Sequence, residues 1–389
     1  MNTLHAPQID VSALAPISVQ EYEQRQETLR RLMHQHGIDA LLLEAGASLV
    51  YFTGVQWGCS ERLTAAIISV SGPLVFVCPH FEEPSFRKQM LPGADVRTWH
   101  EHENPYQSVA QVLAEWGVTS GVLGFEQQVR FFIYDEIKKV LPACECVSAD
   151  PVTVPCRALK SRAELDRMQL AMDITVAAYK HVIPQLREGI TRQECLSMAA
   201  AAHRDMGVSG YIDFQFGQAT SFPHGGPATQ VLKEGDLVLM DGGCTVQGYH
   251  SDISRPIVFG TPNQQHRQIW EVEKEAQAAA FSAAQCGQPC EGVDRAARQV
   301  IVDAGLGPDY ALPGCPHRTG HGIGLDIHEA ENMVRGNLTP LAPGMCFTIE
   351  PMIVTHEFGI RLEDCVYMTP DGPRWFTDPS PSIEQAFAS

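Results

Sequence analysis

The chain lacks any run of about 18 uninterrupted apolar residues, and this absence predicts that no helix of it spans a membrane. Its beginning also lacks the basic segment followed by an apolar segment that is typical of a secretory signal. Basic residues are scarce beside acidic ones, 28 against 46, so the net charge is −18. A chain this acidic repels nucleic acids and anionic membrane surfaces, and neither is expected as a partner. Together these absences predict a cytoplasmic globular protein.

The chain contains cysteine but lacks the spacings that hold structural zinc. Its 12 cysteines are scattered, and no CxxC pair occurs. Several of them, including Cys244, Cys346 and Cys365, lie within apolar, strand-like runs. We therefore expect buried, reduced thiols, in keeping with an intracellular protein.

The first part of the chain alternates between helical and strand-like patterns. Apolar residues at helical spacing predict a helix over 20–36, which Gly37 ends, and a second helix over 107–117. The remaining apolar runs are of strand length: IDALLLEA, SLVYFTGV, AAIISV and PLVFVCP. A length of 389 residues suggests more than one domain. We predict that the first is an α/β domain over residues 1–155.

The pattern changes after this first domain. Pro151 and Pro155 indicate a link between domains. Two capping boxes, which begin at Ser161 and Thr191, then predict the starts of two helices.

Four carboxylates and one histidine stand in Gly-, Pro- or β-rich stretches of this second part. They are Asp241 and Asp252 in MDGGCTVQGYHSDISRP, His321 in GHGIGLDIHE, Glu350 in FTIEPM and Glu363 in IRLED. Each has an ordinary structural explanation by itself, such as a turn aspartate or a core histidine. Hard oxygen ligands with one imidazole, however, suit Mn, Co, Zn or Fe(II) in a shared two-metal site. Five such residues in this order predict a dinuclear metallohydrolase.

The two aspartates and the other three residues fall in different halves of the second part. Residues 161–258 and 263–366 each contain helices followed by strands. Asp241 ends the apolar strand LVLM, and Asp252 lies on a strand that returns beside it. Because antiparallel strands can bring both carboxylates to one face, we expect the site where the two halves meet.

The two histidines of GHGIGLDIHE, His321 and His328, are seven residues apart. In a strand, an odd spacing places side chains on opposite faces unless a bulge intervenes. We therefore predict different roles, with His321 on the metal and His328 over the substrate. In IRLED, alternation places Arg361 and Glu363 on the same face, where the arginine can orient the carboxylate.

A two-metal site of this kind can hold a water molecule and lower its pKa. Glu350 is the predicted general base, which takes a proton from that water and passes it to the leaving amine. Histidines near the metals are predicted to stabilise the developing oxyanion. A further candidate is His224 in FPHGG, where the alternative is a surface histidine on a loop.

At this point the chain resembles the pita-bread metallopeptidases, which include methionine aminopeptidase, aminopeptidase P and Xaa-Pro dipeptidase. IDALLLEAGASLVYFTGV resembles the start of the creatinase-like N-terminal domain, and CRALKSRAEL resembles the entry to the catalytic domain. The resemblance implies an α/β N-terminal domain and, over residues 156–389, an α+β pita-bread catalytic domain with pseudo-twofold halves. The five residues above each match a metal-ligand position. His224 and His328 match two histidines that contact the substrate or the transition state.

Within this family, Arg361 two residues before Glu363, together with the large N-terminal domain, favours the proline-directed branch. The short chain favours hydrolysis of Xaa-Pro dipeptides, with two divalent ions per subunit, Mn²⁺ first and Co²⁺, Zn²⁺ or Fe²⁺ as alternatives. The resemblance also implies a homodimer. An aminopeptidase P that cleaves longer peptides, a small-molecule C–N hydrolase and a binding module without catalysis are the other hypotheses.

Two features of the sequence concern substrate binding. The proline-directed members commonly carry a tyrosine where this chain has Val354, so a hydroxyl is missing here. Arg335 is the nearest candidate for gripping the proline carboxylate, with a surface arginine as the alternative, and Arg361 is the other arginine assigned to substrate binding.

Overall fold

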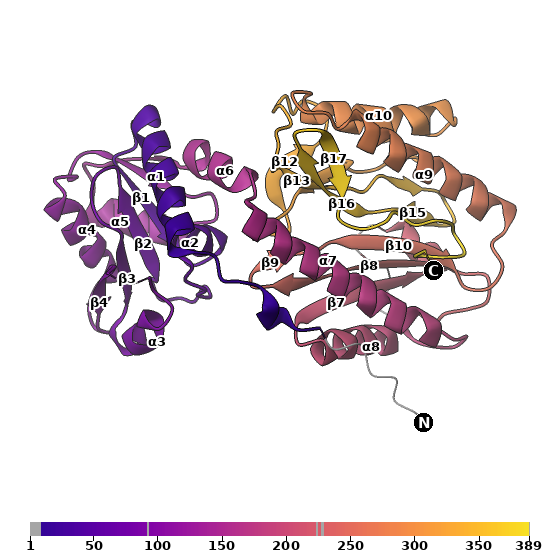
Figure 1. Ribbon diagram of the computed structural model, residues 1–389, viewed down its shortest axis with the longest axis horizontal. Helices are drawn as coiled ribbons and strands as arrows, with labels where there is room; N and C mark the ends of the chain where they lie inside the picture. Colours follow the sequence, from indigo (N-terminus) through magenta and orange to yellow (C-terminus); the bar gives the residue numbers. More distant parts are fainter. Residues whose placement is uncertain (1–8, 92, 223–224, 227–228, 389) are drawn as a thin grey trace. The chain divides into compact units, whose positions relative to one another are not determined.

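The computed structural model describes residues 9–91, 93–222, 225–226 and 229–388. The chain divides into two compact units (Figure 1). The N-terminal unit spans Pro16–Arg157, and the catalytic unit comprises the described residues of Met1–Ala15 and Ala158–Ser389. The domain boundary predicted near residue 155 stays a prediction, which separate folding of the two pieces would test.

The N-terminal unit is built on a six-stranded mixed sheet in the order β4-β3-β2-β1-β5-β6. Strand β1 pairs with β2 in antiparallel and with β5 in parallel orientation. The helices and strands of this unit are α1 (Val19–His36), β1 (Ala40–Glu44), α2 (Ala47–Thr53), β2 (Ala65–Ser69), β3 (Val75–Pro79), α3 (Glu83–Arg87), β4 (Asp95–Trp99), α4 (Pro105–Glu115), β5 (Val122–Phe125), α5 (Phe131–Val140), β6 (Glu145–Ser148) and α6 (Asp150–Ala158).

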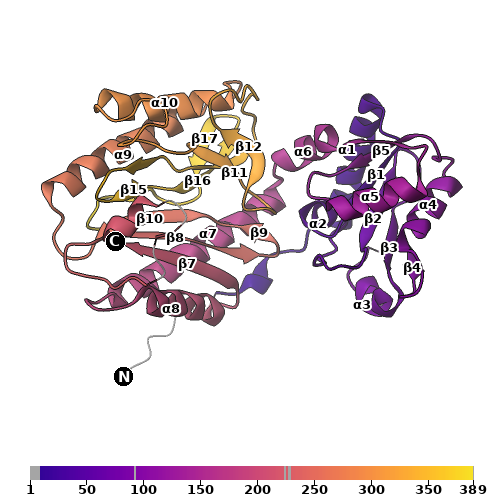
Figure 2. The same ribbon diagram turned by 180° about the vertical axis from the view of Figure 1, so that it is seen from behind.

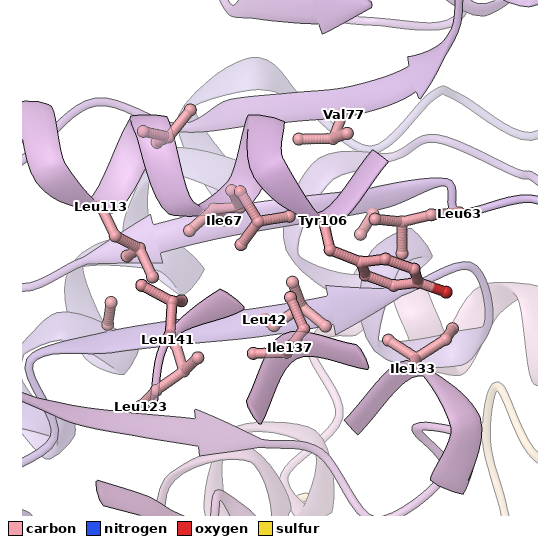
Figure 3. Packing of buried hydrophobic residues seen from close by; sticks show 14 of the residues in the cluster. Leu42, Leu63, Ile67, Val77, Tyr106, Leu113, Leu123, Ile133, Ile137 and Leu141 are labelled. Carbon is pink, nitrogen blue, oxygen red and sulfur yellow. The ribbon is translucent and has the colours of Figure 1, made fainter. Parts of the chain in front are cut away.

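Helices cover both faces of this sheet. Helices α1 and α2 lie on the face seen in Figure 1, and α4 and α5 lie on the face seen in Figure 2. Figure 3 shows the core between the sheet and α4 and α5, where Leu42 and Ile67 of the strands meet Leu113 and Ile137 of the helices. Strands that are buried on both faces are apolar throughout, which explains the continuous runs in the sequence.

One segment of the N-terminal unit differs from its prediction, and the structure adds a helix at a second. SLVYFTGV forms helix α2, not a strand, and Gly54 in the left-handed conformation ends it. A short run rich in aromatic and β-branched residues shows no periodicity that separates a buried helix from a strand. The segment that the two prolines mark as a link is helical, because Pro151 and Pro155 lie within helix α6. Pro151 occupies the first turn, where a missing N–H costs nothing.

The catalytic unit contains two successive sets of paired helices followed by antiparallel strands, which confirms the predicted α+β architecture with two halves. The first set is α7 (Arg162–Val182), α8 (Arg192–Asp205), β7 (Ser209–Phe216), β8 (Leu237–Val246), β9 (Tyr249–His250) and β10 (Ile253–Val258). The second set is α9 (Gln264–Ala283), α10 (Cys290–Asp303), β11 (Gly320–Gly322), β12 (Glu329–Met333), β13 (Cys346–Ile349), β14 (Met352–Val354), β15 (Gly359–Arg361), β16 (Asp364–Thr369) and β17 (Gly372–Trp375).

Local sequence signals place the first two helices of this unit. Both predicted capping boxes form: the side chains of Ser161 and Thr191 accept backbone N–H groups of Glu164 and Glu194, and the glutamates return the contact. Such caps satisfy backbone donors that a helix start leaves without partners.

The strands of the two halves belong to separate sheets that meet at one bridge. The first half forms the sheet β10-β8-β7, with β9 beside β8, and the second half forms β12-β11-β13-β16-β17 and the pair β14-β15. An antiparallel bridge joins Ser254 of β10 to Glu363 of the second half. This bridge lies where the sequence predicts the site.

Two predicted absences can be compared with the structure. All 12 cysteines are free, and nine of them are buried. Among the described residues, no helix is both long and apolar enough to cross a bilayer.

Candidate metal centre

Strand β8 carries the first carboxylate, Asp241, at its middle and not at its end as predicted. The sequence Asp-Gly-Gly suggested a turn, but the strand continues through Gly242 and Gly243. A Cβ at these glycines would lie 2.5 Å and 2.0 Å from the carbonyl oxygens of Tyr211 and Ser251, which belong to adjacent segments of the same chain. The glycines therefore permit close strand approach instead of ending the strand.

Antiparallel pairing brings the second carboxylate to the same face. Strand β10 pairs with β8 so that Ser254 lies opposite Asp241 and Ile253 opposite Gly242. Asp252, directly before β10, therefore falls beside Gly243 on the face that carries Asp241. This pairing confirms the expectation that a returning strand unites the two aspartates.

His321 is buried in the middle of strand β11, and its ring has a defined orientation. Its Nδ1 lies 3.0 Å from the carbonyl oxygen of Gly322, which can only accept, so Nδ1 carries the hydrogen. Its Nε2 faces carboxylates, at 3.2 Å from Glu350 and 3.7 Å from Asp252. Burial lowers the pKa of His321 to about 4. A neutral imidazole with a free Nε2 is the form that binds a metal.

His328 and His321 do not point to opposite faces of one strand, as the odd spacing between them predicted. The chain turns between the two residues, and β11 and β12 pair as an antiparallel hairpin with a register shift. The two rings therefore meet edge to face, with centroids 4.3 Å apart. His328 itself is exposed. Their different roles stay a prediction, but the opposite-face argument for them was wrong.

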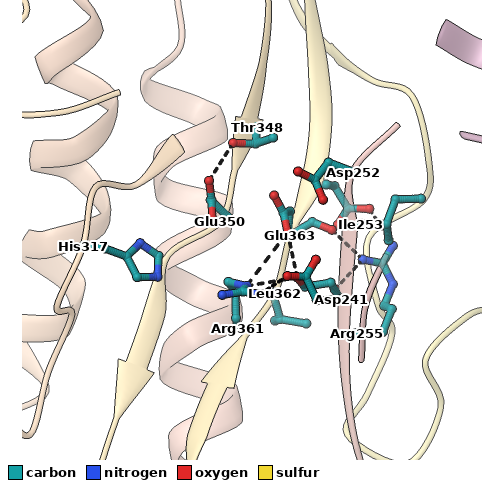
Figure 4. Close-up of polar contacts among 12 residues, drawn as sticks. Asp241, Asp252, Ile253, Arg255, His317, Thr348, Glu350, Arg361, Leu362 and Glu363 are labelled. Atoms are coloured by element: carbon teal, nitrogen blue, oxygen red, sulfur yellow. Dashed lines mark hydrogen bonds and ion pairs between the residues drawn. The ribbon is translucent and has the colours of Figure 1, made fainter. Parts of the chain in front are cut away.

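Glu350 follows β13, and Glu363 follows β15; both carboxylates lie above Arg361 in Figure 4. The hydroxyl of Thr348 donates to Glu350 at 3.0 Å. The hydroxyl of Ser254 donates to Glu363 at 2.7 Å, and the Arg361 Nε donates to Ser254 at 3.0 Å. One oxygen of each glutamate is therefore held by a hydroxyl, which leaves the other for a further partner.

Arg361 lies against these carboxylates, as the alternation in IRLED predicts. Its Nε is 3.9 Å from Glu363, and its guanidinium pairs with Asp241 at 2.5 Å. Burial disfavours its charged form, but Asp241, Glu363 and the other carboxylates outweigh burial and raise the pKa of Arg361. The arginine is thus a permanent cation among acids.

The carboxylates carry more negative charge than one arginine balances. Burial, followed by the nearby charges of Asp241 and Glu350, raises the pKa of Asp252 well above its usual value. Burial and the charge of Asp252 do the same for the pKa of Glu363. One ligand atom from each of Asp252, His321 and Glu363 lies within 4.8 Å of the others. Crowded, buried acids beside a neutral imidazole fit a divalent cation, because a cation would let them ionise.

Two further side chains lie at the site, and no motif in the sequence indicates them. Tyr211 of β7 is paired with Gly243, beside the aspartates, and burial with the charges of Asp252 and Asp241 raises its pKa. The imidazole of His317 faces the space near Glu350 and Arg361 in Figure 4. The register between strands places the first, and an irregular loop places the second.

Three other positions named in the sequence analysis either have other partners or lie outside the described residues. Arg335 is more than half exposed and pairs with Asp309. His224 lies outside the described residues. Val354 packs its side chain in a small apolar cluster with Leu239 and Met352.

With this geometry established, models of known families match both parts of the chain. The model of metallopeptidase family M24 matches residues 166–370, which include all five donor residues. The model of the creatinase/prolidase N-terminal domain matches residues 25–159.

Individual relatives extend over nearly the whole chain. An uncharacterised peptidase of Schizosaccharomyces pombe is 34% identical over 90% of this chain and 80% of its own length. An Xaa-Pro dipeptidase of Lactobacillus delbrueckii is 29% identical over 92% of this chain and 98% of its own. The crystal structure of a prolidase from Thermococcus sibiricus superposes with a TM-score of 0.86 at 27% identity, and covers 94% of this chain and 98% of that one.

Proposed function

This chain belongs to metallopeptidase family M24, and on that premise we propose that it hydrolyses the Xaa-Pro bond of dipeptides and releases proline. The observation that carries the proposal is the convergence of Asp252, His321 and Glu363 within 4.8 Å, in the family's catalytic region. The names of similar proteins, Xaa-Pro dipeptidase and prolidase, supply the substrate class.

The proposed cofactor is a pair of divalent ions, with Mn²⁺ first and Co²⁺, Zn²⁺ or Fe²⁺ as alternatives. Their proposed ligands are Asp241, Asp252, His321, Glu350 and Glu363. When bound, such ions polarise the scissile carbonyl and lower the pKa of a water molecule. The oxygen-rich donor set and the raised pKa values of Asp252 and Glu363 support this assignment.

The side chains divide the remaining work among them. Glu350 takes a proton from the attacking water and delivers it to the proline nitrogen, which leaves. Thr348 keeps the carboxylate of Glu350 oriented through its hydroxyl. His328 and His224 are assigned to the developing oxyanion. Because proline has no N–H and a fixed φ, hydrolysis of the bond before it needs an active site adapted to this geometry.

The two arginines receive different parts in the proposal. Arg361 is buried and contacts Asp241 and Glu363, so its main effect on the substrate is through the carboxylates that it orients. Arg335 is assigned to the proline carboxylate of the substrate. It is exposed and pairs with Asp309, and its substitution tests the assignment.

One observation favours a second candidate, an aminopeptidase P that accepts longer peptides. Val354 has no hydroxyl, and its side chain is buried beside Leu239 and Met352. The side chain common at this position in proline-directed relatives is therefore missing from the site. A wider or less selective site would follow from its absence.

The test is hydrolysis of the Xaa-Pro bond by metal-stripped protein that has been reconstituted with Mn²⁺ or Co²⁺. It is measured as free proline from the dipeptides and as free alanine from Ala-Pro-Ala. Turnover of Ala-Pro and Met-Pro but not of Ala-Pro-Ala is the expected result. Cleavage of Ala-Pro-Ala would assign the chain to the aminopeptidase branch. Lack of activity on all three would contradict both assignments and direct attention to non-peptide C–N bonds.

The proposal also includes a homodimer in the cytoplasm, without a nucleic-acid or membrane partner. The strong negative charge supports the exclusion of nucleic acids and membranes as partners. Light scattering on the purified protein tests the homodimer, because the mass of a monomer at working concentration would contradict it.

A further inference from the structure

Between helix α10 and strand β11 the chain reaches the site through an irregular segment, residues 309–319. In the structure as described, these residues form no helix and no strand and contribute one isolated bridge, from Gly314 to Val354. Backbone carbonyl groups in such a segment need donors from elsewhere. Arg298 of α10 supplies three of them.

Arg298 is largely buried and uses its guanidinium as a fork. Its Nη1 donates to the carbonyl oxygens of Asp309 at 2.7 Å and Cys315 at 3.1 Å, and its Nη2 donates to that of His317. Its Nε lies 3.0 Å from both carboxylate oxygens of Asp294, one helical turn earlier. The ring of Tyr310 also lies against the guanidinium, at 4.3 Å.

Asp294 continues the connection to the end of the segment. Its Oδ1 accepts the hydroxyl of Thr319 at 2.8 Å, and both residues are buried. The carbonyl oxygen of Thr319 in turn accepts the backbone N–H of Glu350 at 2.7 Å. His321 follows two residues later. The ion pair on α10 is therefore linked by hydrogen bonds to the backbone of the proposed general base.

We propose that Arg298 and Asp294 are positioning residues, which hold segment 309–319 so that His317, His321 and Glu350 take their places at the metal centre. The inference rests on the proposed function for its kinetic part only. Partners behind metal ligands commonly set metal affinity and activity by about 10- to 100-fold. Arginine suits this role because its planar fork reaches several carbonyls at once, which an ammonium group cannot.

The experiment compares Arg298→Met with Arg295→Met, a matched control on the same helix. Arg295 is 72% exposed and has a loose ion pair with Glu291 at 4.0 Å, so both variants lose one positive charge from α10. Mn²⁺ affinity of the metal-stripped proteins is measured by calorimetry, together with thermal unfolding and with kcat and KM for Ala-Pro.

The expected result is that Arg298→Met binds Mn²⁺ about 10- to 100-fold more weakly, while Arg295→Met matches the wild type. The kcat of Arg298→Met should fall more than its KM rises. Arg298→Lys should recover thermal stability, because lysine can still pair with Asp294, without recovering Mn²⁺ affinity. If the ion pair only stabilised the fold, Arg298→Lys would recover thermal stability and Mn²⁺ affinity together.

Thr319→Val provides a milder second variant, since it removes the hydroxyl link to Asp294 alone. If Arg298→Met does not fold, Arg298→Lys and Thr319→Val decide by the same criteria. Wild-type Mn²⁺ affinity and kcat in the folded variants, with a lowered melting temperature alone, would overturn the inference. If the wild type releases no proline, the proposed function fails, and Mn²⁺ affinity still decides the role of Arg298.

Discussion

At the scale of single residues, the proposed function gives Glu350 two tasks, those of a metal ligand and of the general base. Its carboxylate lies 3.2 Å from the Nε2 of His321, among the proposed ligands, and also accepts the Thr348 hydroxyl. A carboxylate in this place can both hold a cation and exchange a proton with the water bound to it. Substitution of this residue should therefore affect binding and rate together.

Glu350→Ala is expected to lower kcat by about 10²–10⁴-fold, the range for loss of a general base, and to weaken Mn²⁺ binding. Calorimetry on the metal-stripped variant and proline release from Ala-Pro measure the two effects. Full activity in this variant would exclude Glu350 as the base.

His328 should behave differently, because it is exposed and contacts His321 by its ring edge. His328→Ala is expected to lower kcat by about 10²-fold, as loss of an oxyanion donor does, with metal content nearly intact. Metal analysis after gel filtration supplies the check. Loss of metal from the variant would refute the separate roles of His321 and His328.

The raised pKa values of Asp252 and Glu363 predict that metal binding releases protons. Carboxyl groups with raised pKa values retain protons at higher pH in the metal-free protein, and a cation must displace them. His321, with a pKa of about 4, is already neutral near neutral pH and adds little to this release. Mn²⁺ affinity should therefore fall as the pH falls. Calorimetry in buffers of different ionisation enthalpy measures the protons, and a result of none would contradict the prediction.

At the scale of elements, strand β8 determines the site by having no side chains at two positions. Gly242 lets β7 pack closely on one side, and Gly243 does the same for Ser251, directly before Asp252, on the other, so the aspartates share a face. The register also places Ser254 opposite Asp241. From this position the hydroxyl of Ser254 donates to Glu363. A change in strand spacing would separate all of these groups.

Gly243→Ala should therefore destabilise the protein by about 1–3 kcal/mol and weaken Mn²⁺ binding, because its Cβ would meet the Ser251 carbonyl oxygen at 2.0 Å. Gly58→Ala is the matched control, since a Cβ there has nothing within 4 Å. Urea unfolding of both variants measures the difference. Equal midpoints would show that the segment of Ser251 can move away from β8 without loss.

The same elements show how far prediction from sequence extends. Ser161 and Thr191 marked helix starts correctly, because a capping box is a local signal. Asp241 was assigned to a strand end because the apolar run LVLM stops before it, and only the pairing of β8 with its neighbours shows that the strand continues. SLVYFTGV was misassigned to a strand, since a short apolar run has no periodicity that separates a buried helix from a strand.

For the site, sequence motifs supplied the residue types but not the connections between them. The Asp252, His321 and Glu363 that the motifs contain do converge. By contrast, nothing near Ser254, Tyr211 or Arg298 in the sequence indicates their contacts, because these depend on strand register and on loop path. Residue chemistry can be predicted locally, whereas the supports of a site are tertiary.

At the scale of the whole molecule, all described donors belong to the catalytic unit. Asp241, Asp252, His321, Glu350 and Glu363 lie between α7 and β16, and no described residue of the N-terminal unit is among them. Metal binding should therefore depend on the catalytic unit alone.

A fragment of residues 156–389 is expected to fold and to bind Mn²⁺ within about threefold of the full chain, because domains with their own core can fold alone. Circular dichroism and calorimetry test both expectations, with residues 1–155 as the complementary piece. An unfolded fragment would contradict the boundary predicted near residue 155. A folded fragment that binds no metal would contradict the assignment of the ligands.

The distribution of the free cysteines gives the native chain a practical use as its own reporter. Nine thiols are buried and Cys146 is half-buried, whereas Cys59 of the N-terminal unit and Cys286 of the catalytic unit are exposed. Thiol-directed spin labels or fluorophores should therefore react first at one position in each unit. Dipolar or energy-transfer spectroscopy on such a doubly labelled protein would follow the separation of the units as metal and peptide bind, without an engineered cysteine.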